Sequence, residues 1–153
     1  MTIVDVNVLL YAQDSQSKHH AEARLWFEHL LSESLQVGFA WVVLHGFIRI
    51  ATNPRVLEQP LSMQHACRIV SSWVERSNAL ILIPGPRHWS ILQDLLIKGQ
   101  ARTELVTDAH LAALAIEYGA TLASTDRDFT RFPGLQFLPL FGGHGDTLPH
   151  GGA

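Results

Sequence analysis

Apolar residues along the first 140 positions form short runs that alternate with longer stretches of helical spacing. The short runs predict strands, and the stretches with apolar residues three or four positions apart predict helices. The expected strands are residues 3–6, 36–40, 79–83, 121–125 and 137–140, and the expected helices are residues 7–12, 17–34, 41–52, 63–74, 89–98 and 108–118. Strands that alternate with helices predict an α/β fold, with a parallel sheet of four to five strands and helices on both faces.

Several turn and cap residues mark the ends of these elements. Ser62 is an expected N-cap, because a serine side chain accepts a hydrogen bond from the first turn of a helix. Pro54 stops the helix before it, and Gly119 is expected as a left-handed C-cap. We therefore expect one compact domain over residues 1–141. Residues 142–153 are rich in glycine and contain histidine, and we expect them to be a flexible tail.

Composition narrows the class of protein. The chain is 47% hydrophobic and carries a net charge of -3, so it lacks the basic character of many nucleic-acid-binding proteins. Its single cysteine excludes an internal disulfide bond, which fits a reducing compartment. We expect a cytoplasmic location and no contact with a membrane, because neither a signal peptide nor a membrane-spanning apolar run is visible.

Three aspartates stand at expected junctions between strands and helices. Asp5 interrupts the first apolar run, Asp126 follows the run at residues 121–125, and Asp108 opens an expected helix. Ligands of parallel α/β sheets bind beyond the carboxyl ends of the strands. Carboxylates that meet there repel one another and resist ionisation until a cation binds. The pattern predicts a site for Mg²⁺, with Asp5, Asp108 and Asp126 as ligands, and hydrolytic chemistry.

Each aspartate also has a structural interpretation when it is considered alone. Asp5 could cap the following helix, although Asn7 could serve instead. Asp108 or the preceding Thr107 could cap the helix that begins there, and Asp126 lies in a stretch where aspartate is common in turns. The metal-site hypothesis therefore depends on all three side chains meeting at one edge of one sheet.

Charged neighbours of these aspartates have two interpretations as well. Asp128 and Glu104 either contact a metal ion through water or are solvated surface acids. Arg127 and Arg131 either bind a substrate phosphate or form surface ion pairs. Position in the chain alone does not separate these alternatives.

Three segments carry a resemblance to a known family: Val4-Asp5-Val6-Asn7-Val8-Leu9, the stretch from Thr107 to Ala115, and Leu122 to Phe129. With this order of elements, residues 2–140 resemble the PIN-domain ribonucleases, specifically the VapC-type toxins of prokaryotic toxin–antitoxin pairs. The resemblance implies a three-layer PIN-like fold and an endoribonuclease that hydrolyses RNA with Mg²⁺ or Mn²⁺. It also implies a homodimer that is inhibited by a small VapB-type antitoxin.

The resemblance assigns roles by position. Asp5 and Asp108 match the principal metal ligands of the family, Asp126 matches its third acidic position, and Asn7 matches a polar residue that supports Asp5. Apart from the resemblance, Asp128 and Arg127 are candidates for supporting or substrate-binding groups because they are close to Asp126 in the sequence.

One departure from the family pattern concerns the helix after the second strand. Many PIN domains carry a glutamate there, whereas residues 41–52 contain no carboxylate. His45 or Gly46 takes that place, and His45 is expected to be packed against its surroundings rather than to act as a ligand. The alternative function is therefore a catalytically weak PIN-like module that binds RNA or an antitoxin.

Overall fold

The computed structural model describes residues 1–141, which form one five-stranded, entirely parallel sheet with the strand order β3-β2-β1-β4-β5. The strands are β1 (Thr2–Val4), β2 (Val37–Ala40), β3 (Ala79–Leu82), β4 (Thr121–Ser124) and β5 (Gln136–Pro139). The predicted parallel α/β fold is confirmed. The expected tail, residues 142–153, lies outside the described residues, so the domain boundary at residue 141 stays a prediction.

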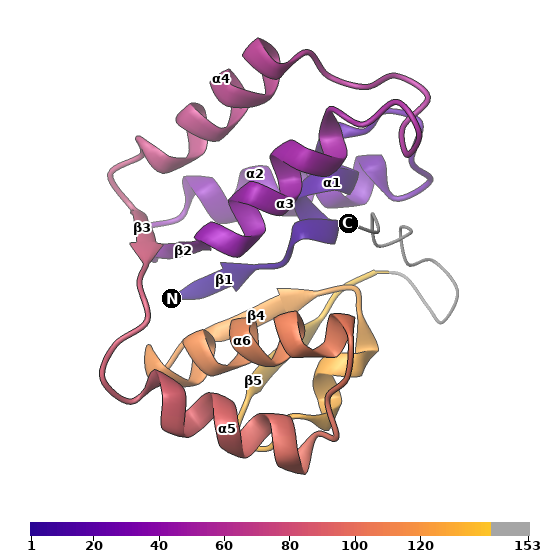
Figure 1. Ribbon diagram of the computed structural model, residues 1–153. Helices are drawn as coiled ribbons and strands as arrows, with labels where there is room; N and C mark the ends of the chain where they lie inside the picture. Colours follow the sequence, from indigo (N-terminus) through magenta and orange to yellow (C-terminus); the bar gives the residue numbers. More distant parts are fainter. Residues whose placement is uncertain (142–153) are drawn as a thin grey trace.

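Helices cover both faces of the sheet and make three layers. The helices are α1 (Val6–Gln13), α2 (His20–Ser32), α3 (Trp41–Ala51), α4 (Met63–Val74), α5 (His88–Lys98) and α6 (Glu104–Glu117), and a short 3-10 helix η1 spans Arg127–Arg131. Figure 1 shows α1 to α4 on one side of the sheet and α5 and α6 on the other. Within residues 1–141, no helix combines the length and the apolar character needed to span a membrane.

Local signals explain most of the element ends. The Ser62 hydroxyl accepts a hydrogen bond from the His65 N–H at 3.1 Å, so the expected cap of α4 is confirmed. Gly119 has a φ of +61°, which is the left-handed conformation expected after α6. The helix expected at residues 17–34 begins only at His20, because the Ser17 hydroxyl accepts from the His19 N–H in a turn before it.

The start of α6 differs from the expectation. The helix begins at Glu104, so Asp108 lies one turn inside it, and neither Asp108 nor Thr107 is its cap. Thr103 takes the non-helical φ of 51° that precedes the first turn. No proline or glycine interrupts the next residues, so the helical hydrogen bonds continue from Glu104 through Asp108.

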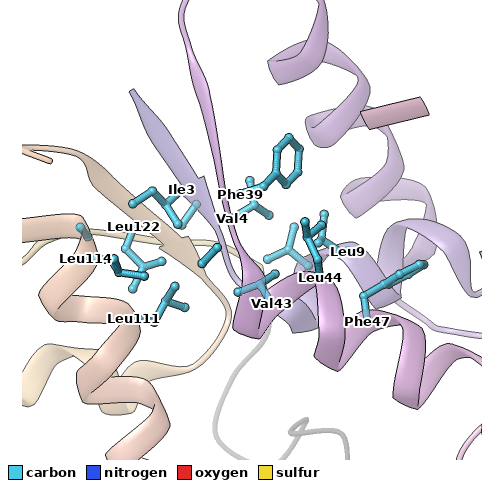
Figure 2. Close-up of a cluster of buried hydrophobic side chains, with 14 of the residues drawn as sticks. Ile3, Val4, Leu9, Phe39, Val43, Leu44, Phe47, Leu111, Leu114 and Leu122 are labelled. Atoms are coloured by element: carbon cyan, nitrogen blue, oxygen red, sulfur yellow. The ribbon is translucent and has the colours of Figure 1, made fainter. Parts of the chain in front are cut away.

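The hydrophobic core lies on both faces of the central strands. Ile3 and Val4 of β1 are fully buried because helices cover that strand from either side. Figure 2 shows the cluster to which they belong, with labelled side chains from α1, β2, α3, α6 and β4: Leu9, Phe39, Val43, Leu44, Phe47, Leu111, Leu114 and Leu122. Packing of this kind holds the carboxyl ends of β1 and β4 in fixed positions.

Candidate active site

The site lies where the strand order of the sheet reverses. From β1 the chain proceeds outward to β2 and β3, and it then crosses back through α5 and α6 to β4 on the other side of β1. Val4 pairs with Ala123, so β1 and β4 end side by side. In open parallel sheets this reversal point is where ligands bind. Asp5 follows the first of these two strands, and Asp126 follows the second by two residues.

Asp5 is buried, and each of its two carboxylate oxygens accepts a hydrogen bond. Its Oδ1 accepts from the Val6 N–H at 2.7 Å, and its Oδ2 accepts from the Ser124 hydroxyl at 2.6 Å. Asp5 is the N-cap of α1, so the capping interpretation is correct for Asp5, and Asn7 is a buried residue of the first turn. A carboxylate at a helix N-terminus also benefits from the helix dipole. Asp5 can cap α1 and also serve as a metal ligand, because both roles need its carboxylate oxygens in a fixed position.

Asp126 is connected to Asp5 through Ser124. The Ser124 hydroxyl accepts from the Asp126 N–H at 2.9 Å while it donates to Asp5, and the Ser124 side chain is fully buried. Asp126 is itself buried and caps η1, because its Oδ1 accepts from the Asp128 N–H at 2.8 Å. The sequence reasoning gave Ser124 no role. The signal for it was a hydroxyl at the end of a buried strand, two residues before an aspartate.

Asp108 reaches the same place from α6. Burial and, after it, the negative charges of Asp5, Asp126, Asp128 and Glu104 together raise the pKa of its carboxyl group from 3.8 to about 8. Two carboxylates that influence each other's ionisation to this degree share one local environment. The structure thus brings Asp5, Asp108 and Asp126 to one edge of the sheet, although they come from three separate parts of the chain.

The donor chemistry of this cluster fits a hard divalent cation, because every nearby acidic group offers carboxylate oxygens. Across residues 1–141, however, no three histidine, cysteine, aspartate or glutamate side chains stand close enough to form a group that could hold a metal ion. The carboxylates affect one another electrostatically without converging on a common point. A bound cation would attract all three carboxylates and so offset their mutual repulsion.

Among the flanking charges, Arg131 is already engaged. Its guanidinium donates to the Gly99 carbonyl at 3.0 Å and lies 3.5 Å from Asp128 Oδ1, which agrees with the ion-pair interpretation for this residue. Arg127 is exposed at the start of η1, next to Asp126. Glu104 is also exposed and accepts from the Thr103 hydroxyl at 2.6 Å. Arg127 is therefore the better placed of the two arginines for a ligand outside the protein.

The α3 position that would carry a further carboxylate is Gly46. His45 is exposed, so the expectation of a packed histidine is wrong: the buried face of α3 consists of residues such as Val43 and Phe47. Gly46 is buried, and a Cβ atom added there would lie 3.5 Å from Cγ2 of Val6, the residue after Asp5. A glutamate at position 46 would start beside the aspartate cluster, whereas one at position 45 would start on the solvent side.

Known proteins with similar sequences point to one family. The model of the PIN domain matches residues 2–135. Ribonuclease VapC37 of Mycobacterium tuberculosis is 42% identical over 137 residues, which cover 90% of this chain and 95% of that protein. VapC ribonuclease Mb2897 of Mycobacterium bovis is 41% identical over 143 residues, which cover 93% of this chain and 97% of the relative.

Solved structures agree on the fold. VapBC2 from Rickettsia felis, bound to a DNA fragment from its promoter, matches with a TM-score of 0.66 at 14% identity and covers 92% of this chain and 98% of that one. VapC20 from Mycobacterium tuberculosis, a toxin that cleaves the sarcin-ricin loop, matches with a TM-score of 0.62 at 17% identity and covers 89% of this chain and 99% of that one. The likeness extends over nearly the whole chain, and the relatives of similar sequence are ribonucleases. The chain therefore belongs to the PIN-domain family and, within it, to the VapC ribonucleases.

Proposed function

We propose that this protein is a Mg²⁺-dependent endoribonuclease, with Mn²⁺ able to replace Mg²⁺, and that it acts as the toxin of a VapBC-type toxin–antitoxin pair. The observation that carries the proposal is the meeting of acids at the ends of β1 and β4. Ser124 joins Asp5 to Asp126, and burial with the charges of neighbouring acids raises the pKa of Asp108 to about 8. In this proposal the cation ligands are Asp5, Asp108 and Asp126, and the supporting or substrate-binding residues are Asn7, Asp128 and Arg127.

The raised pKa supports cation binding for a thermodynamic reason. At neutral pH and without a cation, most Asp108 carboxyl groups keep their proton, because ionisation would add a buried negative charge beside Asp5 and Asp126. A divalent cation reverses this preference, since it attracts all three carboxylates. The protein would therefore release a proton from Asp108 as it binds the metal ion.

Each protein group has a defined part in the proposed reaction. A bound divalent cation supplies positive charge for the phosphodiester group and lowers the pKa of a nearby water molecule. The Ser124 hydroxyl and the Val6 N–H hold both oxygens of Asp5 in place. Arg127, exposed beside Asp126, suits a phosphate oxygen of the RNA, because a guanidinium group donates two parallel hydrogen bonds.

A protein partner and a second copy of the chain belong to the same proposal. The fold matches chains of VapBC complexes, including those from Rickettsia felis and Salmonella typhimurium, in which toxin and antitoxin are bound together. We propose that a VapB-type antitoxin binds this chain and blocks its site, and that the chain forms a homodimer. The cluster of negative charge offers an antitoxin a target for arginine or lysine side chains.

A second candidate function is a PIN-like module that binds RNA or an antitoxin but cleaves poorly. Two observations favour it: α3 carries no carboxylate, and the carboxylates of residues 1–141 do not form a ready group of three. Fewer negative ligands would weaken the affinity for the metal ion. The two candidates differ in whether RNA is cut when metal is supplied.

The deciding experiment measures cleavage of total cellular RNA by the purified protein in Mg²⁺, in Mn²⁺ and in chelator. Asp5→Asn is the test variant, since an amide still caps α1 but carries no charge. Asp94→Asn is the matched control, because Asp94 is an exposed acid of α5 that pairs with Lys98 at 2.9 Å. We expect discrete fragments that require metal, vanish in Asp5→Asn and persist in Asp94→Asn. Cleavage in chelator, or undiminished cleavage by Asp5→Asn, would contradict the proposal. No cleavage under any condition would favour the binding module.

A further inference from the structure

Two of the four tryptophans are largely exposed to solvent. Trp41, the first residue of α3, is 63% exposed, and Trp89, the second residue of α5, is 65% exposed. A single exposed aromatic residue is common on protein surfaces and needs no function by itself. The two tryptophans differ in their position relative to the aspartate cluster.

Trp41 lies at the same edge of the sheet as the aspartate cluster. Strand β2 is the direct neighbour of β1, and Ile3 pairs with Gly38. Two residues further along the paired strands are Asp5 and Ala40, and Trp41 follows Ala40 at once. Figure 2 shows α3 beginning where β2 ends, close to the end of β1. The indole ring thus belongs to the border of the site, whereas Trp89 follows a loop after the edge strand β3.

The exposed face of α3 continues from Trp41 with groups that suit a polyanion. His45 and Arg49 follow at intervals of four residues, so they lie on the same face as Trp41, and both are exposed. The helix has no carboxylate, and the next acidic residue along the chain is Glu58, although the whole protein has a net charge of -3. An aromatic ring that is followed by cationic and polar side chains is the combination found where proteins bind single-stranded nucleic acids.

We infer that Trp41 stacks on an unpaired nucleobase of the RNA and so holds the strand beside the aspartate cluster. This inference rests on the proposed function and adds a residue that positions the RNA strand at the site. Proteins that recognise RNA by its bases use unpaired nucleotides, because bases in a helix are already stacked and paired. Every base has a π-face, so an exposed indole ring accepts any of them.

Binding is the direct test, and cleavage must be prevented while it is measured. The probe is a fluorescent single-stranded RNA oligonucleotide of mixed sequence, and its anisotropy is followed in chelator for the wild type, Trp41→Ala, Trp41→Phe and Trp89→Ala. We expect Trp41→Ala to weaken binding by about 5- to 150-fold, the effect of losing one stacked base. Trp41→Phe should keep most of the affinity, and Trp89→Ala should bind like the wild type. Because the Trp41 ring is exposed, all variants should keep the melting temperature of the wild type.

A second probe separates stacking from general attraction to the backbone. In a series of oligonucleotides each base is removed in turn while the ribose and phosphate remain. Removal of the base that stacks on Trp41 should weaken binding to the wild type and have no further effect on Trp41→Ala. Equal losses in both proteins at every position would overturn the inference.

The remaining outcomes are also decisive. Equal affinity of Trp41→Ala and wild type, equal losses in Trp41→Ala and Trp89→Ala, or no RNA binding by the wild type would each overturn it. So would a Trp41→Ala variant that binds RNA normally but loses self-association, because the ring would then belong to a protein interface. A protein that binds RNA through Trp41 yet never cleaves it would overturn the nuclease proposal and leave the inference standing.

Discussion

Asp108 is the residue whose chemistry depends most on groups distant in the sequence. Its carboxyl group is partly buried, and the acids that act on it follow β1, follow β4 or begin α6. Its pKa of about 8 means that the carboxyl group changes its charge near neutral pH, where an isolated aspartate is fully ionised. Protonation of this one side chain therefore links the stability of the fold to the occupancy of the site.

The first prediction concerns stability as a function of pH in the absence of divalent cations. The folded pKa of Asp108, about 8, lies above its unfolded value of 3.8, so between these values the folded state binds more protons than the unfolded state. The contribution of Asp108 to the free energy of unfolding is thus complete below about pH 4 and is lost as the pH rises to about 8. We expect Asp108→Asn to remove this decline, and urea denaturation between pH 4 and pH 9 in chelator measures it.

The control for this measurement is Asp94→Asn, since Asp94 is exposed and is not among the acids that raise the pKa of Asp108. That variant should follow the pH dependence of the wild type. A wild-type curve that rises steadily between pH 4 and pH 8, or an Asp108→Asn curve that runs parallel to the wild type, would show that Asp108 ionises normally.

At the level of elements, the glycines of β2 and α3 differ in whether the structure has room for a side chain. Gly38 lies in the fully buried strand β2, where a Cβ atom would be 3.0 Å from Cγ1 of Ile3 and 3.1 Å from Cδ1 of Leu82. Gly46 lies in the interior of α3, where a Cβ atom would meet only Cγ2 of Val6, at an ordinary 3.5 Å. Packing excludes a side chain at the first position and permits a small one at the second.

These two glycines give the second prediction. Gly46→Ala should raise the free energy of unfolding by about 0.5 to 1 kcal/mol, because alanine favours the helix and its methyl group has room. Gly38→Ala should lower the free energy of unfolding, by roughly 1 to 3 kcal/mol, because β1 and β3 must move to admit the methyl group. Chemical denaturation of both variants measures the changes. A destabilised Gly46→Ala variant would mean that the space beside Val6 is smaller than the structure indicates.

For the whole molecule, the sheet brings carboxylates together, and their repulsion lowers the stability of the fold until a cation binds. Buried like charges destabilise the metal-free fold, and a ligand that binds only the folded state stabilises it. Asp5 also has a structural part as the cap of α1 and the acceptor of the Ser124 hydroxyl. Replacement by asparagine keeps an acceptor oxygen there, so this change separates the charge of Asp5 from its capping.

The third prediction is that Mg²⁺ and Mn²⁺ raise the melting temperature of the wild type more than that of Asp5→Asn or Asp108→Asn. At a free metal concentration 100-fold above Kd the gain is about 2.7 kcal/mol, which for a domain of this size raises Tm by roughly 5 to 10 °C. Without metal, both variants should be as stable as the wild type or slightly more stable. Differential scanning fluorimetry with and without chelator measures both effects. Metal-free variants that are far less stable than the wild type would identify these aspartates as structural caps only.

Local features of the fold were predictable because neighbouring residues determine them. The periodicity of apolar residues indicated every strand, and Ser62 and Gly119 marked the ends of their helices through their own conformational preferences. The predicted start of α6 was wrong, because Thr107 and Asp108 are residue types that are common at helix starts. A residue typical of caps shows only where a helix can begin. The helical hydrogen bonds of α6 show that this helix begins at Glu104.

The sequence by itself determined the alternation of strands and helices, the positions of Asp5 and Asp126 after apolar strands, and the resemblance to the PIN-domain ribonucleases. Only the tertiary structure decided that β1 lies between β2 and β4, that Ser124 joins Asp5 to Asp126, and that Gly46 rather than His45 faces the start of α1. Hydrophobic periodicity is a property of adjacent residues, so it can be recognised along the chain. Strand order, burial and the shift in the pKa of Asp108 arise from packing between segments up to about 120 residues apart, so they exist only in the folded molecule.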